Sequence, residues 1–278
     1  MKTRAMLAAT SLAVLPTFAG TAHGAAAHTV QVAYAGSLVA TMEGPLKTEL
    51  RERTGLVLAG EAKGSRALAN LISAGLRTPD VFISAERSLV MKLQKQHLVR
   101  SNVDFGSAYM VLAYSEKSPH SALFESAAAG KTFILDVLAN PDVRVGRTDP
   151  QLDPKGARTI RVLQLLGAHF HDPEKARAIL AKAETFPEED LAVRVESGEV
   201  DAGFFYSTEI PGRSLRAVEL PDDANLSNDI EYTLAVMQNA PHLRAAQTFA
   251  AFVLDGPGKA ILEQAGVRYF TQPHRSGS

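Results

Sequence analysis

Hydrophobic and polar residues follow each other along the chain in an order that predicts strands alternating with helices. Short runs rich in β-branched and aromatic residues, such as TVQVAYAG (29–36) and DVFISA (80–85), are typical of buried strands. The stretch RALANLISAGL (66–76) between them has apolar residues three or four positions apart, which predicts an amphipathic helix. This repeated strand–helix order indicates an α/β fold with a largely parallel sheet.

The same order resumes in the second half of the chain, so two α/β lobes fit the pattern better than one continuous sheet. We expect a long strand near residues 108–114 to cross into a second lobe, and the stretch near 206–218 to return. The prediction is a discontinuous first lobe of residues 28–107 and 213–275 and an inserted lobe of residues 108–212. A polar tail is expected after Gly266. Ligands in such folds bind between the lobes, outside the carboxyl ends of the strands.

The first residues have the features of a secretory signal peptide. Lys2 and Arg4 supply positive charge, an apolar stretch runs from Ala5 to Phe18, and small residues follow. We therefore expect residues 1–27 to be removed and the mature protein to reach the periplasm. No later segment is apolar enough to span a bilayer.

Composition and net charge exclude several classes of partner and site. The 278 residues carry a formal net charge of −1, so no general basic field favours nucleic acid or an anionic membrane. The chain has no Cys, which excludes disulfides and thiolate sites. A site for an anion would have to be local.

Two strand–helix junctions could supply such a site. Ala35-Gly36-Ser37 and Lys63-Gly64-Ser65 each place a hydroxyl and free backbone N–H groups at the start of a helix. Several short donors converging on one point suit a small oxyanion. Either Ser37 or Ser65 can equally be a simple helix cap, and the pattern alone leaves both interpretations open.

Acidic residues mark two further junctions. Asp153 precedes Pro154 and can be a turn residue or a helix cap, while Glu188 and its acidic neighbours can be a charged first helical turn. Tyr206 closes an apolar strand and is either a hydroxyl donor or a core aromatic residue. Four cations near these junctions could offset negative charge, although we expect each to be an ordinary solvated residue: Lys63, Arg66, Lys155 and Arg158.

Six segments together resemble the periplasmic molybdate- and tungstate-binding proteins of ABC importers, most closely the branch first known from archaea. The resemblance covers nearly all of the mature chain and is carried by the order and spacing of AYAGSL, EAKGSRAL, PDVFISAE, GRTDPQLDPKGAR, FPEEDLAVRVESGEVDAGFFYSTE and VELPDDANLS. It implies the two-lobed type II periplasmic-binding-protein fold, with molybdate or tungstate held in the cleft and delivered to an ABC permease. It also implies a monomer without a cofactor.

The resemblance also implies particular ligand residues. The two Ser motifs of the family fall on Ser37 and Ser65, and the Tyr that closes the strand falls on Tyr206. The carboxylates that bind the Mo or W atom directly fall on Asp153 and Glu188, with Glu189 one position away as the alternative. One departure is Ala157, where archaeal members usually have an aromatic residue.

Two other functions remain open on the sequence. The same fold could bind another small anion or a ferric ion, although ferric sites use several Tyr phenolates and only Tyr206 lies near the return crossover. An enzyme of the hydrolase type could use Asp153 and Glu188 as an acid/base pair. The eight His residues form no H-x-x-x-H pattern, and no G-x-S-x-G or phosphate-loop motif is present, so we expect no catalytic activity.

Overall fold

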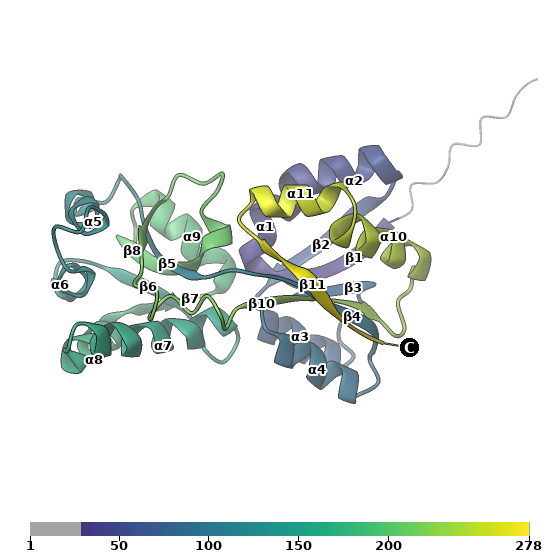
Figure 1. Cartoon of the computed structure of the whole chain (residues 1–278), viewed down its shortest axis with the longest axis horizontal. Coiled ribbons are helices and arrows are strands. Elements are labelled where there is room, and N and C mark those ends of the chain that lie inside the picture. Colours follow the sequence, from purple (N-terminus) through teal and green to yellow (C-terminus); the bar gives the residue numbers. More distant parts are fainter. Residues whose placement is uncertain (1–28, 278) are drawn as a thin grey trace, which may run out of the picture.

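The computed structural model describes residues 29–277, with side chains described as far as His274, and divides into two lobes side by side (Figure 1). The signal peptide expected at residues 1–27 lies outside the described residues. Within the described part, none of the helices has the length and apolar character needed to cross a membrane.

The first lobe is built on a six-stranded sheet with helices on both faces (Figure 1). The strands lie in the order β11-β4-β10-β3-β1-β2. Their bounds are β1 (Thr29–Ala35), β2 (Val57–Lys63), β3 (Val81–Ser84), β4 (Val99–Ser107), β10 (Glu231–Met237) and β11 (Arg268–Gly277). The helices are α1 (Val39–Thr41), α2 (Lys47–Thr54), α3 (Ser65–Ser73), α4 (Arg87–Lys95), α10 (Leu243–Leu254) and α11 (Pro257–Gln264).

The second lobe has a five-stranded sheet in the order β7-β6-β8-β5-β9. Its strands are β5 (Met110–Tyr114), β6 (Val145–Thr148), β7 (Glu184–Phe186), β8 (Ala202–Tyr206) and β9 (Arg216–Glu219). Its helices are α5 (Ser121–Ala128), α6 (Ile134–Ala139), α7 (Pro154–His169), α8 (Pro173–Lys182) and α9 (Glu188–Ser197).

The two-lobed α/β architecture is confirmed, but both sheets are mixed rather than largely parallel. In the first lobe β1 runs parallel to β2 and β3, whereas β10 is antiparallel to β3 and β4. In the second lobe β5 is antiparallel to both β8 and β9. The chain enters β10 and β5 from the other lobe rather than through a covering helix, and a strand that enters in this way need not be parallel to its neighbours.

Two segments lie elsewhere than the pattern predicts. Residues expected to form a polar tail make β11, which pairs antiparallel with β4 at the sheet edge. Strand β9 pairs with β5 and therefore belongs to the second lobe, so the boundary expected after residue 212 falls too early. Both strands lie at a sheet edge, where one side is open and the apolar signal is weak.

The connections bring four strand ends to the junction between the lobes. Strand β1 leads into a short 3₁₀ turn at Gly36–Leu38, and β2 leads into α3. From the other side, β6 is followed by α7 and β7 by α9. Because the carboxyl ends of parallel strands share one edge of a sheet, these four turns face each other across the two lobes.

A buried carboxylate in the second lobe gives a test of the fold away from this junction. Asp201 is fully buried and accepts hydrogen bonds from the hydroxyl of Ser118 at 2.8 Å and the backbone N–H of Arg144 at 2.8 Å. Burial alone would raise the pKa of Asp201, but the hydrogen bonds from Arg144 and Ser118 hold it below its ordinary value.

We expect Asp201→Ala to lower the free energy of unfolding by about 2–3 kcal/mol, because it leaves buried donors without an acceptor. Chemical denaturation measures the loss. Asp142→Ala is the matched control, since that residue is exposed, and should change stability by about 0.5 kcal/mol or less. Equal stability of the two variants would contradict the prediction.

Candidate functional site

The two lobes meet at a tightly packed junction, which we call the interlobe seam: Ser37, Ser65, Asp153, Glu188, Tyr206 and the residues that touch them. The backbone N–H of Ala67 in the first lobe donates to the carbonyl of Leu152 in the second at 2.9 Å. Arg66 reaches across to the carbonyl of Pro150 at 3.0 Å. A Cβ atom added to Gly64 would lie 2.7 Å from the Leu152 carbonyl oxygen, so only Gly allows this approach.

Ser37 and Ser65 are both buried at this seam. The Ser37 hydroxyl shares a hydrogen bond of 3.0 Å with the hydroxyl of Tyr232, which in turn bonds Thr208 at 2.9 Å. The Ser65 hydroxyl accepts from the backbone N–H of Ala85 at 3.2 Å. Neither side chain caps its own helix by a hydrogen bond, so the simple capping interpretation fails for both.

Asp153 caps α7, as the sequence allowed, and also faces the first lobe. Its Oδ1 accepts from the backbone N–H of Lys155 at 3.1 Å, while its Oδ2 is buried with no hydrogen-bond partner. Its Cβ lies against Gly64, 3.0 Å from where a Cβ of that glycine would be. A capping carboxylate needs one oxygen for the helix, and the second oxygen of Asp153 is left for another contact.

Glu188 and Glu189 differ in burial and in their contacts. The Glu188 side chain is 4% exposed, and its Oε2 lies so close to Gly36 that any Cβ there would overlap it. The Glu189 side chain is 43% exposed and forms an ion pair with Lys63 at 3.5 Å. Of the two glutamates, only Glu188 therefore lies within the seam.

A buried ammonium group holds the acidic side of the seam together. The Nζ atom of Lys155 donates to Oε1 of Glu209 at 2.7 Å and to Oε1 of Glu188 at 3.3 Å, and its side chain is fully buried. The expectation that Lys155 is a solvated cation is therefore wrong. Buried charges are stable only when paired, and here one cation serves two carboxylates.

Arg158 joins the remaining predicted residue to the first lobe. One guanidinium nitrogen donates to the Tyr206 hydroxyl at 2.7 Å and to the carbonyl of Ala85 at 2.9 Å. Ala85 also donates to Ser65, so a chain of hydrogen bonds runs from Ser65 to Tyr206. Arg158 is half-buried and bridges the lobes. The expectation that it is an ordinary solvated cation is therefore wrong.

Burial shifts the acidities at the seam. It raises the pKa of Glu188 to about 8, and the negative charges of Asp153 and Glu209 add to the effect against the opposing charge of Lys155. It likewise raises the pKa of Asp153. The pKa of Lys155 stays above its ordinary value, because the carboxylates outweigh the effect of burial. Burial also raises the pKa of Tyr206, and that of Tyr232 to about 12, so both are hydroxyl groups at neutral pH.

The seam thus combines two kinds of oxygen. Asp153 Oδ2 and Glu188 Oε2 are buried carboxyl oxygens without a partner, and the hydroxyls of Ser37 and Ser65 are buried in the same seam. In the part of the chain from 29 to 277, no three His, Asp or Glu side chains are grouped as ligands for a metal cation. Unpartnered buried carboxylate oxygens are rare and costly, which makes this seam the strongest candidate site.

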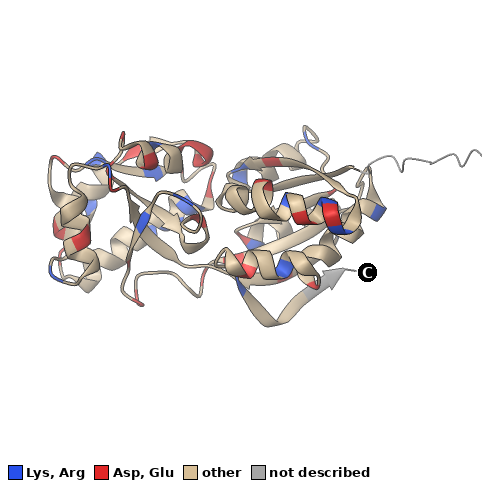
Figure 2. Ribbon diagram, turned by 90° about the horizontal axis from the view of Figure 1, so that it is seen from above, with Lys and Arg blue, Asp and Glu red and all other residues tan. Residues whose placement is uncertain are grey.

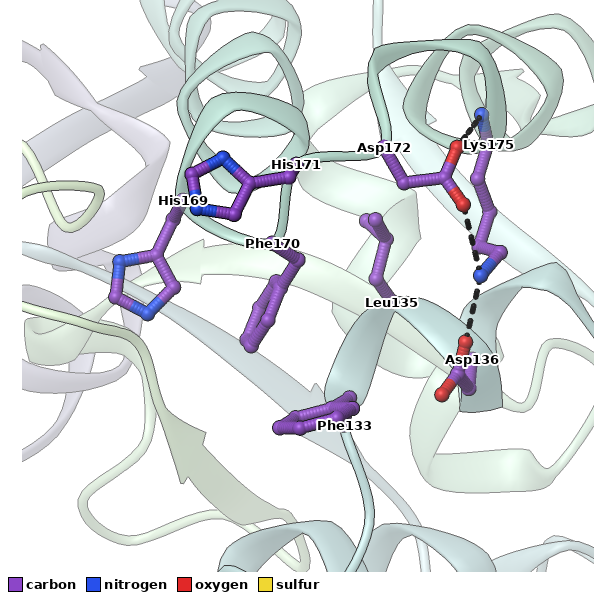
Figure 3. A pocket seen from close by; sticks show the side chains of 8 residues that line it. All are labelled: Phe133, Leu135, Asp136, His169, Phe170, His171, Asp172 and Lys175. Carbon is purple, nitrogen blue, oxygen red and sulfur yellow. Dashed lines mark hydrogen bonds and ion pairs between the residues drawn. The ribbon is translucent and has the colours of Figure 1, made fainter.

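A second candidate is a hollow of about 430 Å³ at the far end of the second lobe, between α6 and the start of α8 (Figure 3). Its cation, Lys175, is held by Asp136 at 2.8 Å and by Asp172 at 2.9 Å. His169 pairs with Asp223 at 3.0 Å. Lys175 is thus satisfied by the two carboxylates, and it is not free for an anion.

The distribution of charged residues along the two lobes does not single out either region. Figure 2 shows Lys and Arg interspersed with Asp and Glu over both lobes, in agreement with the net charge of −1. Any selectivity for an anion must therefore arise from the buried groups.

Three residues of the seam were not predicted as members of a site: Thr208, Glu209 and Tyr232. Thr208 and Glu209 directly follow Tyr206, and Tyr232 lies in the apolar strand IEYTLAVM. A buried strand gives no signal for a functional hydroxyl, so Tyr232 could not have been distinguished from the core. Glu209 gave no signal either, because charge balance around a single lysine does not call for another acidic residue.

Comparison with known proteins places the chain in a family. Residues 30–268 match a family described as bacterial extracellular solute-binding proteins. A Haloferax volcanii protein, named provisionally as an ABC transporter molybdenum-binding protein, is 31% identical over 205 residues. The alignment covers 74% of this chain but only 64% of that relative.

Two further similar proteins are also named for the binding of molybdate. The molybdate/tungstate-binding protein WtpA of Pyrococcus abyssi is 24% identical over 270 residues, covering 78% of this chain and 76% of WtpA. The structure of the periplasmic molybdate-binding protein of Azotobacter vinelandii superposes with a TM-score of 0.67 at 20% identity, over 87% of this chain and 99% of that one. At this identity the structural likeness supports the fold alone.

The raised pKa of Glu188 predicts an unusual pH dependence of stability. The folded protein keeps the Glu188 proton up to about pH 8, whereas an unfolded Glu releases it near its ordinary value of 4.5. Stability therefore falls as pH rises between these values. We expect Glu188→Gln to stabilise the protein at neutral pH by about 1–3 kcal/mol, with a gain that grows from about pH 5 to about pH 8.

Thermal unfolding across this pH range measures the effect. Glu189→Gln is the matched control, because its exposed ion pair contributes about 0.5 kcal/mol or less. The same pH dependence of stability in wild type and Glu188→Gln would contradict the prediction that Glu188 destabilises the protein as pH rises.

Proposed function

The chain belongs to the family of bacterial extracellular solute-binding proteins, and we propose that it captures molybdate or tungstate between its lobes and delivers the ion to an ABC permease. The observation that carries the proposal is the pair of buried carboxyls, Asp153 and Glu188. Each has one unpartnered oxygen, and each packs against the glycine that precedes Ser65 or Ser37. The names of the relatives point to the same ions.

Glu188 keeps its proton in the ligand-free protein near neutral pH and must release it to bind the metal atom. Two carboxylates beside a dianion then need a physical justification, since like charges repel. The repulsion is offset if the free oxygens of Asp153 and Glu188 bind the metal atom of the ion itself. A high-valent Mo or W centre is hard, prefers oxygen ligands and can expand from four to six of them. Sulfate and phosphate cannot expand in this way, so the same carboxylates would reject them.

The hydroxyl groups complete the proposed site. In this proposal Ser37 and Ser65 donate to the oxo groups of the ion. The hydroxyl of Tyr206 is held by Arg158 and is the third candidate donor. The cationic side chains of Lys155 and Arg158 offset the negative charge of the acidic wall. No further cofactor is required, because the ion is the cargo.

Capture requires movement of the lobes. Glu188 lies directly against Gly36, and Gly64 lies against Asp153, so the seam is packed when the lobes are together. An ion would enter with the lobes apart and be enclosed as they close, by a hinge motion of the chain segments that connect them. The connecting segments are the one between β4 and β5 and the one between β9 and β10.

A ferric ion is the main alternative ligand, because two tyrosines lie at the seam. Burial raises the pKa of both Tyr206 and Tyr232, and their hydroxyls are engaged with Arg158, Ser37 and Thr208. Phenolate ligation would require both to lose their protons in a buried place, which disfavours iron. A hydrolase is disfavoured because the partners of Ser37 and Ser65 are Tyr232 and a backbone N–H, with no His as a general base.

The family is extracytoplasmic, and we infer that this member works in the periplasm after removal of residues 1–27. We further infer that it acts as a monomer that binds neither nucleic acid nor a cofactor and has no catalytic activity. Basic and acidic residues alternate along both lobes, which is consistent with a freely diffusing carrier (Figure 2).

Calorimetric titration of the mature protein with molybdate, tungstate, sulfate, phosphate and ferric citrate tests the proposal. We expect binding of the first two ions and none of the others. Asp153→Ala and Glu188→Ala should each weaken molybdate binding by about tenfold or more, because each removes one oxygen ligand. Glu189→Ala is the matched control. It removes only an exposed ion pair with Lys63 and should change the affinity by about twofold or less. Binding of sulfate or iron without molybdate or tungstate would overturn the proposed ligand.

Lobe closure gives an independent prediction. Gly64→Ala places a methyl group against the Leu152 carbonyl of the opposite lobe, at 2.7 Å, and neither backbone can easily move. We expect molybdate affinity to fall by about five- to a hundredfold, the range for an overpacked contact, with little change in the unfolding midpoint of the ligand-free protein.

The matched control for closure is Gly60→Ala on β2, the strand that precedes Gly64. The nearest neighbours of its added methyl are Glu43 and Tyr34 of its own lobe. Gly60→Ala should keep the wild-type affinity. Small-angle scattering in saturating molybdate should show a more extended Gly64→Ala protein. A Gly64→Ala protein as compact as the wild type would contradict the closure prediction.

A further inference from the structure

One residue, Lys155, contacts both carboxyls of the proposed site, and it does so through two different groups. Its backbone N–H donates to Oδ1 of Asp153 at 3.1 Å, while its ammonium group donates to Oε1 of Glu188 at 3.3 Å. In each carboxyl the second oxygen, Asp153 Oδ2 or Glu188 Oε2, is the one without a partner. Lys155 therefore accounts for which oxygen of each carboxyl is free.

The ammonium group is itself fixed from behind. It donates to Oε1 of Glu209 at 2.7 Å, and Oε2 of Glu209 accepts from the backbone N–H of Tyr206 at 2.8 Å. It also lies 5.0 Å from the centre of the Phe205 ring. The chain of contacts thus runs from strand β8 through Glu209 and Lys155 to Glu188.

This arrangement differs from an ordinary buried ion pair. A pair that only stabilised the fold would be complete with Lys155 and Glu209, whose contact is the shorter of the two. The additional contact to Glu188 reaches from α7 to the start of α9 and orients a carboxyl whose other oxygen faces the first lobe at Gly36. Holding an otherwise mobile side chain in its binding position reduces the entropy lost when a ligand binds.

We propose that Lys155, anchored by Glu209, is a positioning residue of the oxyanion site, which turns the free oxygens of Asp153 and Glu188 toward the bound ion. The inference rests on the proposed function and deepens it. The side chain of Lys155 positions Glu188, and its backbone positions Asp153. Replacing the side chain should therefore affect only one of the two carboxyls.

The test is a pair of double-mutant cycles measured by calorimetric titration with molybdate. Lys155→Met keeps the length of the side chain and removes its charge. We expect it to weaken binding by about tenfold or more, the effect of losing a charged hydrogen bond. It is combined in turn with Glu188→Gln and with Asp153→Asn.

The expected results differ between the two cycles. In the Glu188→Gln background, Lys155→Met should change the affinity by about threefold or less, because the carboxyl it positions is already gone. In the Asp153→Asn background, it should retain its full effect, because the backbone N–H that orients Asp153 is unchanged. The same loss in both backgrounds would overturn the proposal and leave Lys155 as a general source of positive charge.

A variant of unchanged net charge separates position from charge in a second way. Lys155→Met with Glu209→Gln removes one positive and one negative charge together, and replacing both partners of a buried pair is usually tolerated by the fold. The double variant can therefore still be measured if Lys155→Met alone fails to fold. We expect molybdate binding to remain about tenfold or more weaker than in the wild type. Wild-type affinity would overturn the positioning role.

Controls distinguish this inference from the proposed function. Lys182→Met removes a half-buried lysine that donates to the carbonyls of Asn140 and Val143 in the second lobe, and it should leave the affinity unchanged. Failure of the wild-type protein to bind molybdate or tungstate would overturn both conclusions. Wild-type binding with additive cycles would overturn only the role of Lys155.

Discussion

Burial of several charges at one place imposes the strongest constraint on this molecule. Three carboxyls, those of Asp153, Glu188 and Glu209, are almost fully removed from water around the single ammonium of Lys155. Taking charges out of water costs several kcal/mol for each ion unless partners replace the solvent. The seam therefore depends on a hydrogen-bond arrangement that satisfies one oxygen of Asp153 and of Glu188 and leaves the other free. The rest of the architecture can be understood as the means of bringing these groups together.

The two lobes supply complementary halves of that arrangement. The first lobe contributes glycines and hydroxyls, at Gly36-Ser37 and Gly64-Ser65, where the backbone can be approached closely. The second contributes the charged groups, held on the first turns of α7 and α9. In the proposed site neither half is complete, so ion binding would require the two lobes to close. This coupling is what a carrier needs, because an enclosed ion can be released only when the lobes separate.

Local pattern was a good guide wherever one residue type has a single physical role. The Gly-Ser junctions and the Asp-Pro cap were readable, because glycine permits close approach and aspartate caps helices in any fold. The tail that becomes β11 and the strand β9 were misplaced, since edge strands have one open side and little apolar periodicity. Strand direction in the mixed sheets also escaped prediction, because it depends on how the chain passes between lobes.

The sequence by itself determined the α/β class, the division into two lobes, and the positions of Ser37, Ser65, Asp153 and Glu188 at strand–helix junctions. Only the tertiary structure decided that Glu188 rather than Glu189 lies inside, and that Lys155 is buried rather than solvated. The physical reason is that burial is a property of long-range packing. Neighbouring glutamates on a helix point in different directions, and a lysine is charged in either environment, so only the residues packed around it reveal whether water or carboxylates surround it.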